Sequence, residues 1–166
     1  MRLAIQRNNN FLLLLFIFFI TACTSVRLVS NYDEQTDKAL MLLQQNADDF
    51  ITKLIANAPS ENNSFEKNKN FYEDADQQIR RLEFRVSSIP KNDTTQRLVK
   101  NIRTSILGDG KCDENGSSLM DLHCSPENIM KGPSKMALQI SQRNINQTIG
   151  AALSLELAKK QGLDQN

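Results

Sequence analysis

The side chains best suited to chemistry in this chain are Cys112, His123 and Cys124, which fall within one short segment. In an oxidising compartment the two cysteines would form a disulfide, and closing a loop of this length stabilises a fold by about 3 kcal/mol. The alternative is a metal site. Adjacent His123 and Cys124 would strain the backbone to bind one ion, and Asp113 or Asp121 would have to complete the four ligands that structural zinc requires. The pattern favours a Cys112–Cys124 disulfide and predicts no metal ion.

Catalysis by a histidine would have to use His123, because the chain has 1 histidine. A nucleophile also needs a base held against it and oriented by a third group, and no Gly-x-Ser-x-Gly elbow is present. Carboxylate pairs such as Asp48-Asp49 and Asp74-Asp76 leave acid–base catalysis open as an alternative. They fall on predicted polar helix faces, where charged residues are usually solvated. We therefore expect no catalytic residues and no cofactor.

A different chemistry, that of binding surfaces, is indicated around Phe84. This residue points away from the apolar stripe of its own predicted helix, and Arg80, Arg81 and Arg85 surround it. An aromatic residue among arginines is typical of the residues that dominate protein interfaces. Further basic residues follow at Lys91, Arg97, Lys100 and Arg103. The alternative, which is the commoner arrangement, is that Phe84 packs against another helix or a loop. The arginines would then pair with Glu73, Asp74 and Asp76. A partner surface on this chain, if present, is expected at Phe84, Arg80, Arg81 and Arg85.

The N-terminus has the pattern of an export signal. Arg2 and Arg7 precede an apolar run over residues 11–20, which is about half the length that spans a bilayer. Thr21 and Ala22 then lead directly to Cys23. The arrangement resembles a bacterial lipoprotein signal, which implies removal of residues 1–22 and acylation of Cys23 with fatty acids such as palmitate. The alternative is an ordinary secretory signal with an incidental cysteine.

Removal of that signal would leave 144 of the 166 residues, which is enough for one domain. The 20 basic residues would fall to 18 against 19 acidic ones, a formal charge of −1. Nucleic-acid binding requires concentrated positive charge, so this balance argues against it. Membrane attachment needs no surface charge if Cys23 carries two or more acyl chains.

Four stretches have the period of amphipathic helices. The first spans residues 31–57, and its stripe is Thr36, Leu40, Leu43, Ala47, Phe50, Leu54 and Ala58. The second begins near Ser64, whose hydroxyl can cap it, and ends before Pro90; its stripe is Phe65, Tyr72, Ala75, Ile79, Leu82 and Val86. The third follows Asn92 or Asp93, carries Leu98, Ile102 and Ile106, and ends at Gly108.

The fourth stretch begins at Ser134 and ends at Gly162, with a stripe of Leu138, Ser141, Ile145, Thr148, Ala152 and Leu155. Residues 108–133 separate it from the third and are predicted to be an irregular, disulfide-closed loop. One apolar stripe per helix and short links predict an all-α, antiparallel up-down bundle of about four helices. The predicted divisions are a signal at 1–22, an acylated tether at 23–30 and a bundle domain at 31–162. A coiled-coil homodimer is the alternative.

Three segments are similar to parts of one family of small proteobacterial lipoproteins with no assigned activity. They are residues 29–40 (VSNYDEQTDKAL), 81–92 (RLEFRVSSIPKN) and 153–162 (LSLELAKKQG). The resemblance does not extend to the loop of Cys112 and Cys124. It implies a helical, membrane-tethered periplasmic domain, and it brings no catalytic residues with it.

These observations together predict a non-enzymatic lipoprotein whose helical domain contacts another protein of the cell envelope. Thr24 follows Cys23 where an aspartate would retain a lipoprotein in the inner membrane. We therefore expect the periplasmic face of the outer membrane. Two alternatives stay open: a carrier that holds a small apolar ligand or lipid between its helices, and an enzyme that uses surface carboxylates.

Overall fold

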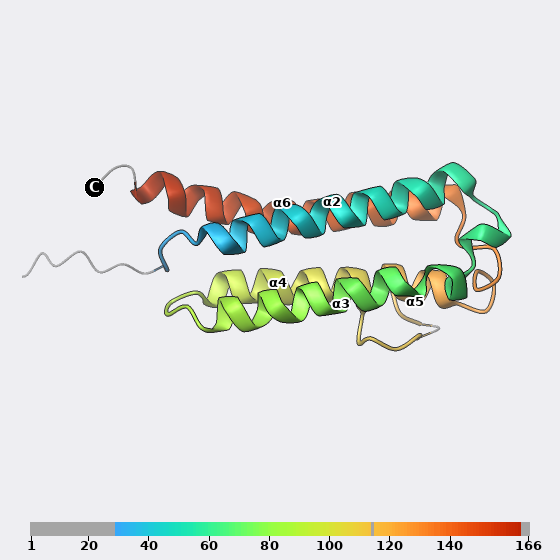
Figure 1. Ribbon diagram of the computed structural model, residues 1–166, viewed down its shortest axis with the longest axis horizontal. Helices are drawn as coiled ribbons and strands as arrows, with labels where there is room; N and C mark the ends of the chain where they lie inside the picture. Colours follow the sequence, from blue (N-terminus) through green and yellow to red (C-terminus); the bar gives the residue numbers. More distant parts are fainter. Residues whose placement is uncertain (1–28, 114, 164–166) are drawn as a thin grey trace, which may run out of the picture.

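The computed structural model describes residues 29–113 and 115–163, so Cys23 and the predicted signal lie outside the described residues. The described chain is helical and has no strand. Four long helices run side by side, and a short one lies in the link before the last of them (Figure 1). The long helices are α2 (Glu34–Asn57), α3 (Phe65–Ser87), α4 (Asp93–Leu107) and α6 (Lys135–Leu163). The shorter elements are a 3-10 turn, η1 (Glu61–Asn63), and α5 (Leu119–Cys124). No helix in this described part is long and apolar enough to cross a bilayer.

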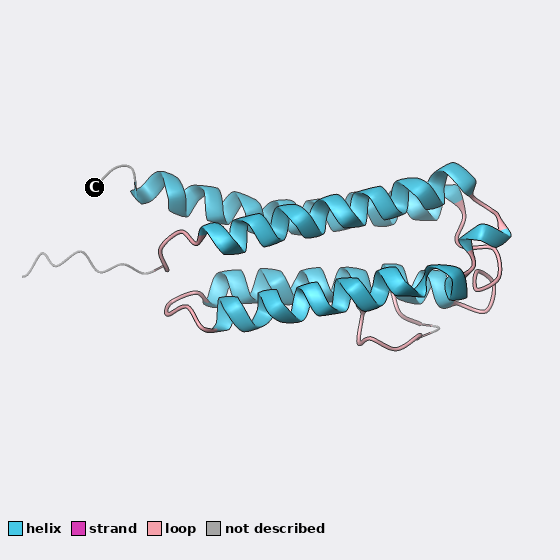
Figure 2. Cartoon of the chain, viewed as in Figure 1, coloured by secondary structure: helices cyan, strands magenta, loops and turns pink. Residues whose placement is uncertain are grey.

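The long helices form the antiparallel up-down bundle that the sequence predicts. Consecutive helices run in opposite directions, and each long helix packs against two others: α2 against α3 and α6, and α4 against α3 and α6 (Figure 1). Short loops make the links at residues 58–64 and 88–92, whereas the link from α4 to α6 is longer and contains α5 (Figure 2). The short α5 packs against α4 and α3.

The core of the bundle follows the predicted stripes with local differences in three helices. In α4 the buried side chain is Val99, and the predicted Leu98 is only half-buried. In α2 the side chain at the centre is Ile51, which is fully buried, and the predicted Phe50 is only half-buried because it lies at the boundary with α3 and stacks on Phe71. In α6 the stripe continues through Ile149 and Glu156 in place of Thr148 and Leu155. These differences arise because an α-helix repeats every 3.6 residues. A stripe assigned by strictly alternating steps of three and four residues therefore drifts off the buried face.

Two predicted helix ends are wrong for local reasons, and a third is confirmed without its predicted capping bond, since α3 begins directly after Ser64. The first helix begins at Glu34 and not at residue 31, because the Asp33 side chain accepts a hydrogen bond from the Thr36 amide at 3.0 Å. The Ser64 hydroxyl makes no capping bond to α3. Helix α6 continues past Gly162 to Leu163, since Gly162 does not adopt the positive φ with which glycine ends a helix. Gly108 does adopt a positive φ, of 58°, at the end of α4.

The loop between α4 and α6 contains the predicted Cys112–Cys124 disulfide and more regular structure than expected. A capping box starts α5: Ser118 accepts from the Asp121 amide, and Asp121 accepts from the Ser118 amide. Gly116 lies against the same carboxylate, and a Cβ there would be 2.2 Å from the Asp121 Oδ2 atom. The prediction of a wholly irregular segment was wrong because a helix of one and a half turns is too short to show a period.

Candidate functional site

Three places in the described chain combine polar or aromatic side chains that the core does not require. One is a buried histidine beside the disulfide. The second is a buried polar network at the opposite end of the bundle, where the described chain begins. The third is the exposed surface around Phe84. At each place the contacts decide which side chains are available for function.

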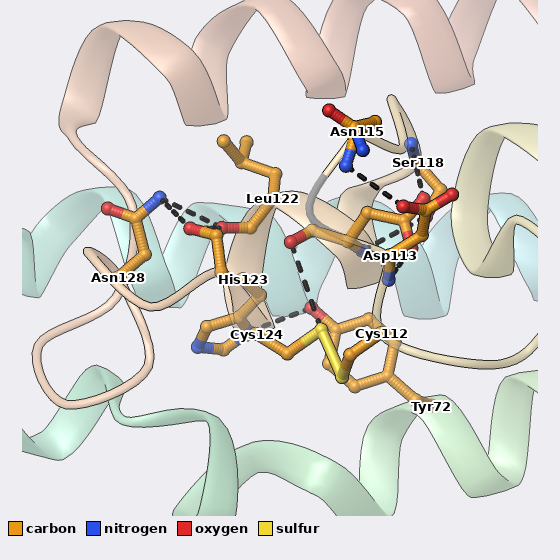
Figure 3. The surroundings of a disulfide bond; sticks show 11 residues. Tyr72, Cys112, Asp113, Asn115, Ser118, Leu122, His123, Cys124 and Asn128 are labelled. Atoms are coloured by element: carbon orange, nitrogen blue, oxygen red, sulfur yellow. Dashed lines mark hydrogen bonds between the residues drawn. A yellow bond between two sulfur atoms is a disulfide. The ribbon is translucent and has the colours of Figure 1, made fainter.

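The histidine lies between two helices and the 3-10 turn, and both of its ring nitrogens are bonded. His123 is fully buried; its Nε2 is 2.6 Å from the backbone oxygen of Asn63, and its Nδ1 is 2.7 Å from the Tyr72 hydroxyl (Figure 3). A carbonyl oxygen only accepts, so Nε2 carries the proton and donates it. In the neutral ring Nδ1 is then the acceptor, and the Tyr72 hydroxyl donates to it. The residue therefore joins α5 to α3 and η1.

Burial sets the protonation of this pair. It lowers the pKa of His123, against a smaller opposing contribution from the Asn63 carbonyl. Burial also raises the pKa of the Tyr72 hydroxyl well above its usual value. Phe65 and Phe50 pack around the ring, with centroids 5.6 and 6.3 Å from that of His123. A neutral histidine with both nitrogens occupied has no position left for a substrate or a metal ion.

The side chains expected for the alternative metal site make other contacts in the structure. Cys112 and Cys124 are bonded to each other (Figure 3), and Asp121 accepts from the amides of Ser118 and Asp113. Across residues 29–113 and 115–163, no group of three or more histidine, cysteine, aspartate or glutamate side chains is arranged to hold a metal ion. Cys112, His123 and Cys124, which the sequence offered as candidate ligands, instead hold the loop around α5 in place.

The second place is a buried polar network centred on an ion pair. Lys159 and Glu156, both on α6, have side chains 4% and 1% exposed, and their Nζ and Oε1 atoms are 2.6 Å apart. The ammonium also donates to Asn92 Oδ1 and Thr95 Oγ1, each at 2.8 Å. Thr95 donates to the same carboxylate at 3.1 Å. The sequence pattern did not predict this network, because it placed Leu155 on the apolar stripe at the position that Glu156 takes in the structure.

This network fastens the start of the described chain to the bundle. The Ser30 hydroxyl donates to Asn92 Oδ1 at 2.8 Å, and the Ser30 amide donates to the backbone oxygen of Lys91 at 2.9 Å. Asp33 then accepts two hydrogen bonds from Arg85, both at 2.6 Å, and its backbone amide donates to Glu156 at 3.4 Å. The Arg85 guanidinium holds the pKa of the Asp33 carboxyl well below its usual range.

The third place is the surface predicted around Phe84, and the structure divides its residues. Phe84 is 76% exposed, so the alternative that it packs against another helix or a loop is wrong. The arginines are engaged separately. Arg80 pairs with Asp76, as that alternative expected for one arginine; Arg81 donates to Gln77 at 3.2 Å, and Arg85 pairs with Asp33. The four predicted residues share α3, but the arginines do not form one cationic ring.

A groove between α3 and α4 runs beside Phe84 and has a volume of about 630 Å³. Its lining includes Phe84, Glu83 and Ser87 from α3 and Arg97, Lys100 and Arg103 from α4. Arg103 bridges to Glu83 at 2.8 Å and to Asp76 at 2.8 Å, so its charge is matched. Within the described residues, the side chains of Arg97 and Lys100 have no ion pair. The groove therefore combines an exposed ring with two unmatched cations.

Comparisons with protein-family models, with curated proteins and with solved structures find no match to this chain. The family resemblance of the three segments stays a prediction, and the function must be argued from the residues.

Proposed function

We propose that this protein is a bacterial lipoprotein that is anchored through Cys23 and presents a helical domain close to the membrane, where the Phe84 surface contacts another envelope protein. The observation that carries the contact is Phe84 itself, which is 76% exposed beside a groove with two unmatched cations. Aromatic residues and arginine are enriched in protein interfaces relative to the rest of the surface. The anchor is supported by the signal pattern before Cys23.

The proposed anchor limits how far the domain can move from the bilayer. Ser30 is bonded to the α3–α4 link, and seven residues lie between it and Cys23, counting Cys23 itself. At most about 3.6 Å per residue, this segment spans no more than roughly 25 Å. The end of the bundle that carries the link and Phe84 would then stay near the membrane. The disulfide end would lie at most about 35 Å farther out, which is the length of the 23 residues of α3.

A non-enzymatic role is supported by how the reactive side chains are used. The two cysteines close a loop, the histidine joins three elements, and the buried Glu156 and Lys159 fasten the chain start. The contacts of His123 and of the Glu156–Lys159 pair satisfy polar groups that would otherwise be buried without a partner. We found no specific observation that favours the carrier or the surface-carboxylate enzyme.

The anchor is tested with Cys23→Ser in cells fed a labelled palmitate analogue. The expected result is loss of the label and release from the membrane fraction, because the modified thiol is absent. The double variant Cys112→Ser/Cys124→Ser is the matched control and should keep both. Label or membrane retention in Cys23→Ser would refute the anchor.

The contact is tested by crosslinking in intact cells followed by capture of the full chain. Phe84→Ala should remove a crosslinked protein that the wild type retains. The matched control is Met136→Ala, which truncates a side chain 73% exposed at the start of α6. An unchanged set of crosslinked proteins in Phe84→Ala would count against the proposed surface.

A further inference from the structure

The charges of the groove point to the kind of partner it accepts. We infer that the groove binds an acidic segment of a protein, in which an apolar side chain covers the Phe84 ring and carboxylates pair with Arg97 and Lys100. This inference rests on the proposed function, which assigns the Phe84 surface to a protein contact. It adds the chemistry of the occupant.

Two cations of the groove remain without an ion pair among the described residues. Arg103 is held between Glu83 and Asp76, and this pairing also uses the Glu83 carboxylate. Arg97 and Lys100 are three residues apart on α4, so their side chains project on one side of the helix. Two adjacent cations without partners make the middle of the groove positive, and carboxylates are the protein groups that complement them.

The groove has one carboxylate outside these ion pairs, and its position limits where acidic residues of a partner can lie. Asp93 lies in the first turn of α4, at the end of the groove beyond Arg97, where the helix dipole favours negative charge. It would repel an acidic residue placed over that end. The acidic residues of the partner should therefore lie over Lys100 and Arg97 and stop short of Asp93, which sets their position along the groove.

Exposed carboxylates near the groove favour a protein segment over an anionic bilayer surface as its partner. The exposed side of α3 and α4 carries Glu73, Asp74 and Asp93 as well as the basic residues, and Arg80 is paired to Asp76. A flat anionic surface would meet these carboxylates together with the cations. A narrow acidic segment seated between the helices meets only Arg97 and Lys100, so we favour the protein segment.

The test places a photoactivatable crosslinker at Ser87, which lines the groove and is exposed, in the full-length chain made in cells. Mass spectrometry of the crosslinked peptide should identify an acidic segment that contains an apolar residue. Arg97→Glu/Lys100→Glu should lower the adduct yield roughly 16-fold, since each rim charge contributes about a 4-fold effect and the two effects multiply. The matched control is Lys53→Glu/Lys135→Glu, which reverses two exposed lysines at the other end of the bundle and should leave the yield unchanged.

A charge exchange makes the result specific. Replacing the acidic residues of the captured segment by lysine should restore the adduct with Arg97→Glu/Lys100→Glu, and this rescue also shows that the double variant is folded. A protein adduct whose yield ignores both charge reversals would overturn the acidic-segment inference and leave the proposed function standing. Adducts to lipid alone, with no protein crosslinked from Ser87, would overturn both.

Discussion

Removing one partner of the buried ion pair gives the sharpest test of the structural reasoning. Lys159→Met deletes three contacts: 2.6 Å to Glu156 and 2.8 Å each to Asn92 and Thr95. The Glu156 carboxylate, with its side chain 1% exposed, then keeps only the Thr95 hydroxyl and the amide of Asp33. Breaking a buried pair in this way costs about 3–5 kcal/mol, because a charge stays buried without compensation.

Removing both partners should cost much less than removing one. Glu156→Leu/Lys159→Met takes both charges out of the interior and fills the space with apolar atoms, which is often neutral or stabilising for a buried pair. Thr95 would lose its side-chain partners, a cost of about 1–2 kcal/mol. The double variant should therefore lie within roughly 2 kcal/mol of the wild type, above the single Lys159→Met variant in stability.

Urea unfolding of residues 24–166, followed by circular dichroism, measures these free energies of unfolding. Lys160→Met is the matched control, since Lys160 is the exposed neighbour and its Nζ lies 5.5 Å from the centre of the Tyr32 ring. We expect it to cost less than about 1 kcal/mol. The reasoning is refuted if Lys159→Met loses no more stability than Lys160→Met, or if the double variant is less stable than the single one.

Three further predictions concern the α5 loop. Burial lowers the pKa of His123 in the folded protein, so its contribution to stability is present above the unfolded pKa near 6.5 and is lost as pH falls through that value toward the folded one; unfolding free energies at pH 7.5 and 5.5 should differ more for the wild type than for His123→Gln. Cys112→Ala/Cys124→Ala should lower the free energy of unfolding by about 3 kcal/mol, and the wild type under reducing conditions should lose a similar amount; equal stability of reduced and oxidised protein would contradict this. Gly132→Ala should destabilise more than Gly110→Ala, because both positions have positive φ but only at Gly132 would a Cβ lie 2.6 Å from Asn63; equal melting temperatures would be the contrary result.

Much of the fold was predictable because most buried positions follow helical periodicity. Tyr72, Ala75, Ile79, Leu82 and Val86 were assigned to one stripe and are all buried in α3. Proline after Ala58 and after Ile89 marks both short links, and these links impose antiparallel neighbours. The disulfide followed from counting cysteines once Cys23 was set aside. These features depend on local sequence and on spacing, so no tertiary information was needed.

The surroundings of Phe84 were predictable only in part. Its exposed position agrees with its angle on the helix, although packing against another helix or a loop was the commoner expectation. Which arginines remain unpaired does not follow from α3 alone. Arg85 is matched by Asp33, which is 52 residues away, and Arg103 reaches back to Glu83 and Asp76 on α3. Pairing across helices therefore leaves Arg97 and Lys100 on α4 without an ion pair among the described residues, while Arg81 on α3 donates to the neutral side chain of Gln77.

Periodicity, prolines and cysteine count were sufficient for the helical class, the order of the long helices and the Cys112–Cys124 bond, since each depends on residues whose relative positions are set by the chain itself. Tertiary structure alone decided that His123 would be neutral and bonded to Tyr72, and that Glu156 would be buried with Lys159. It also decided which cations would face the groove. The physical reason is that hydrogen-bond and charge partners are chosen by proximity in space, and a sequence pattern specifies a helix face without specifying what that face meets.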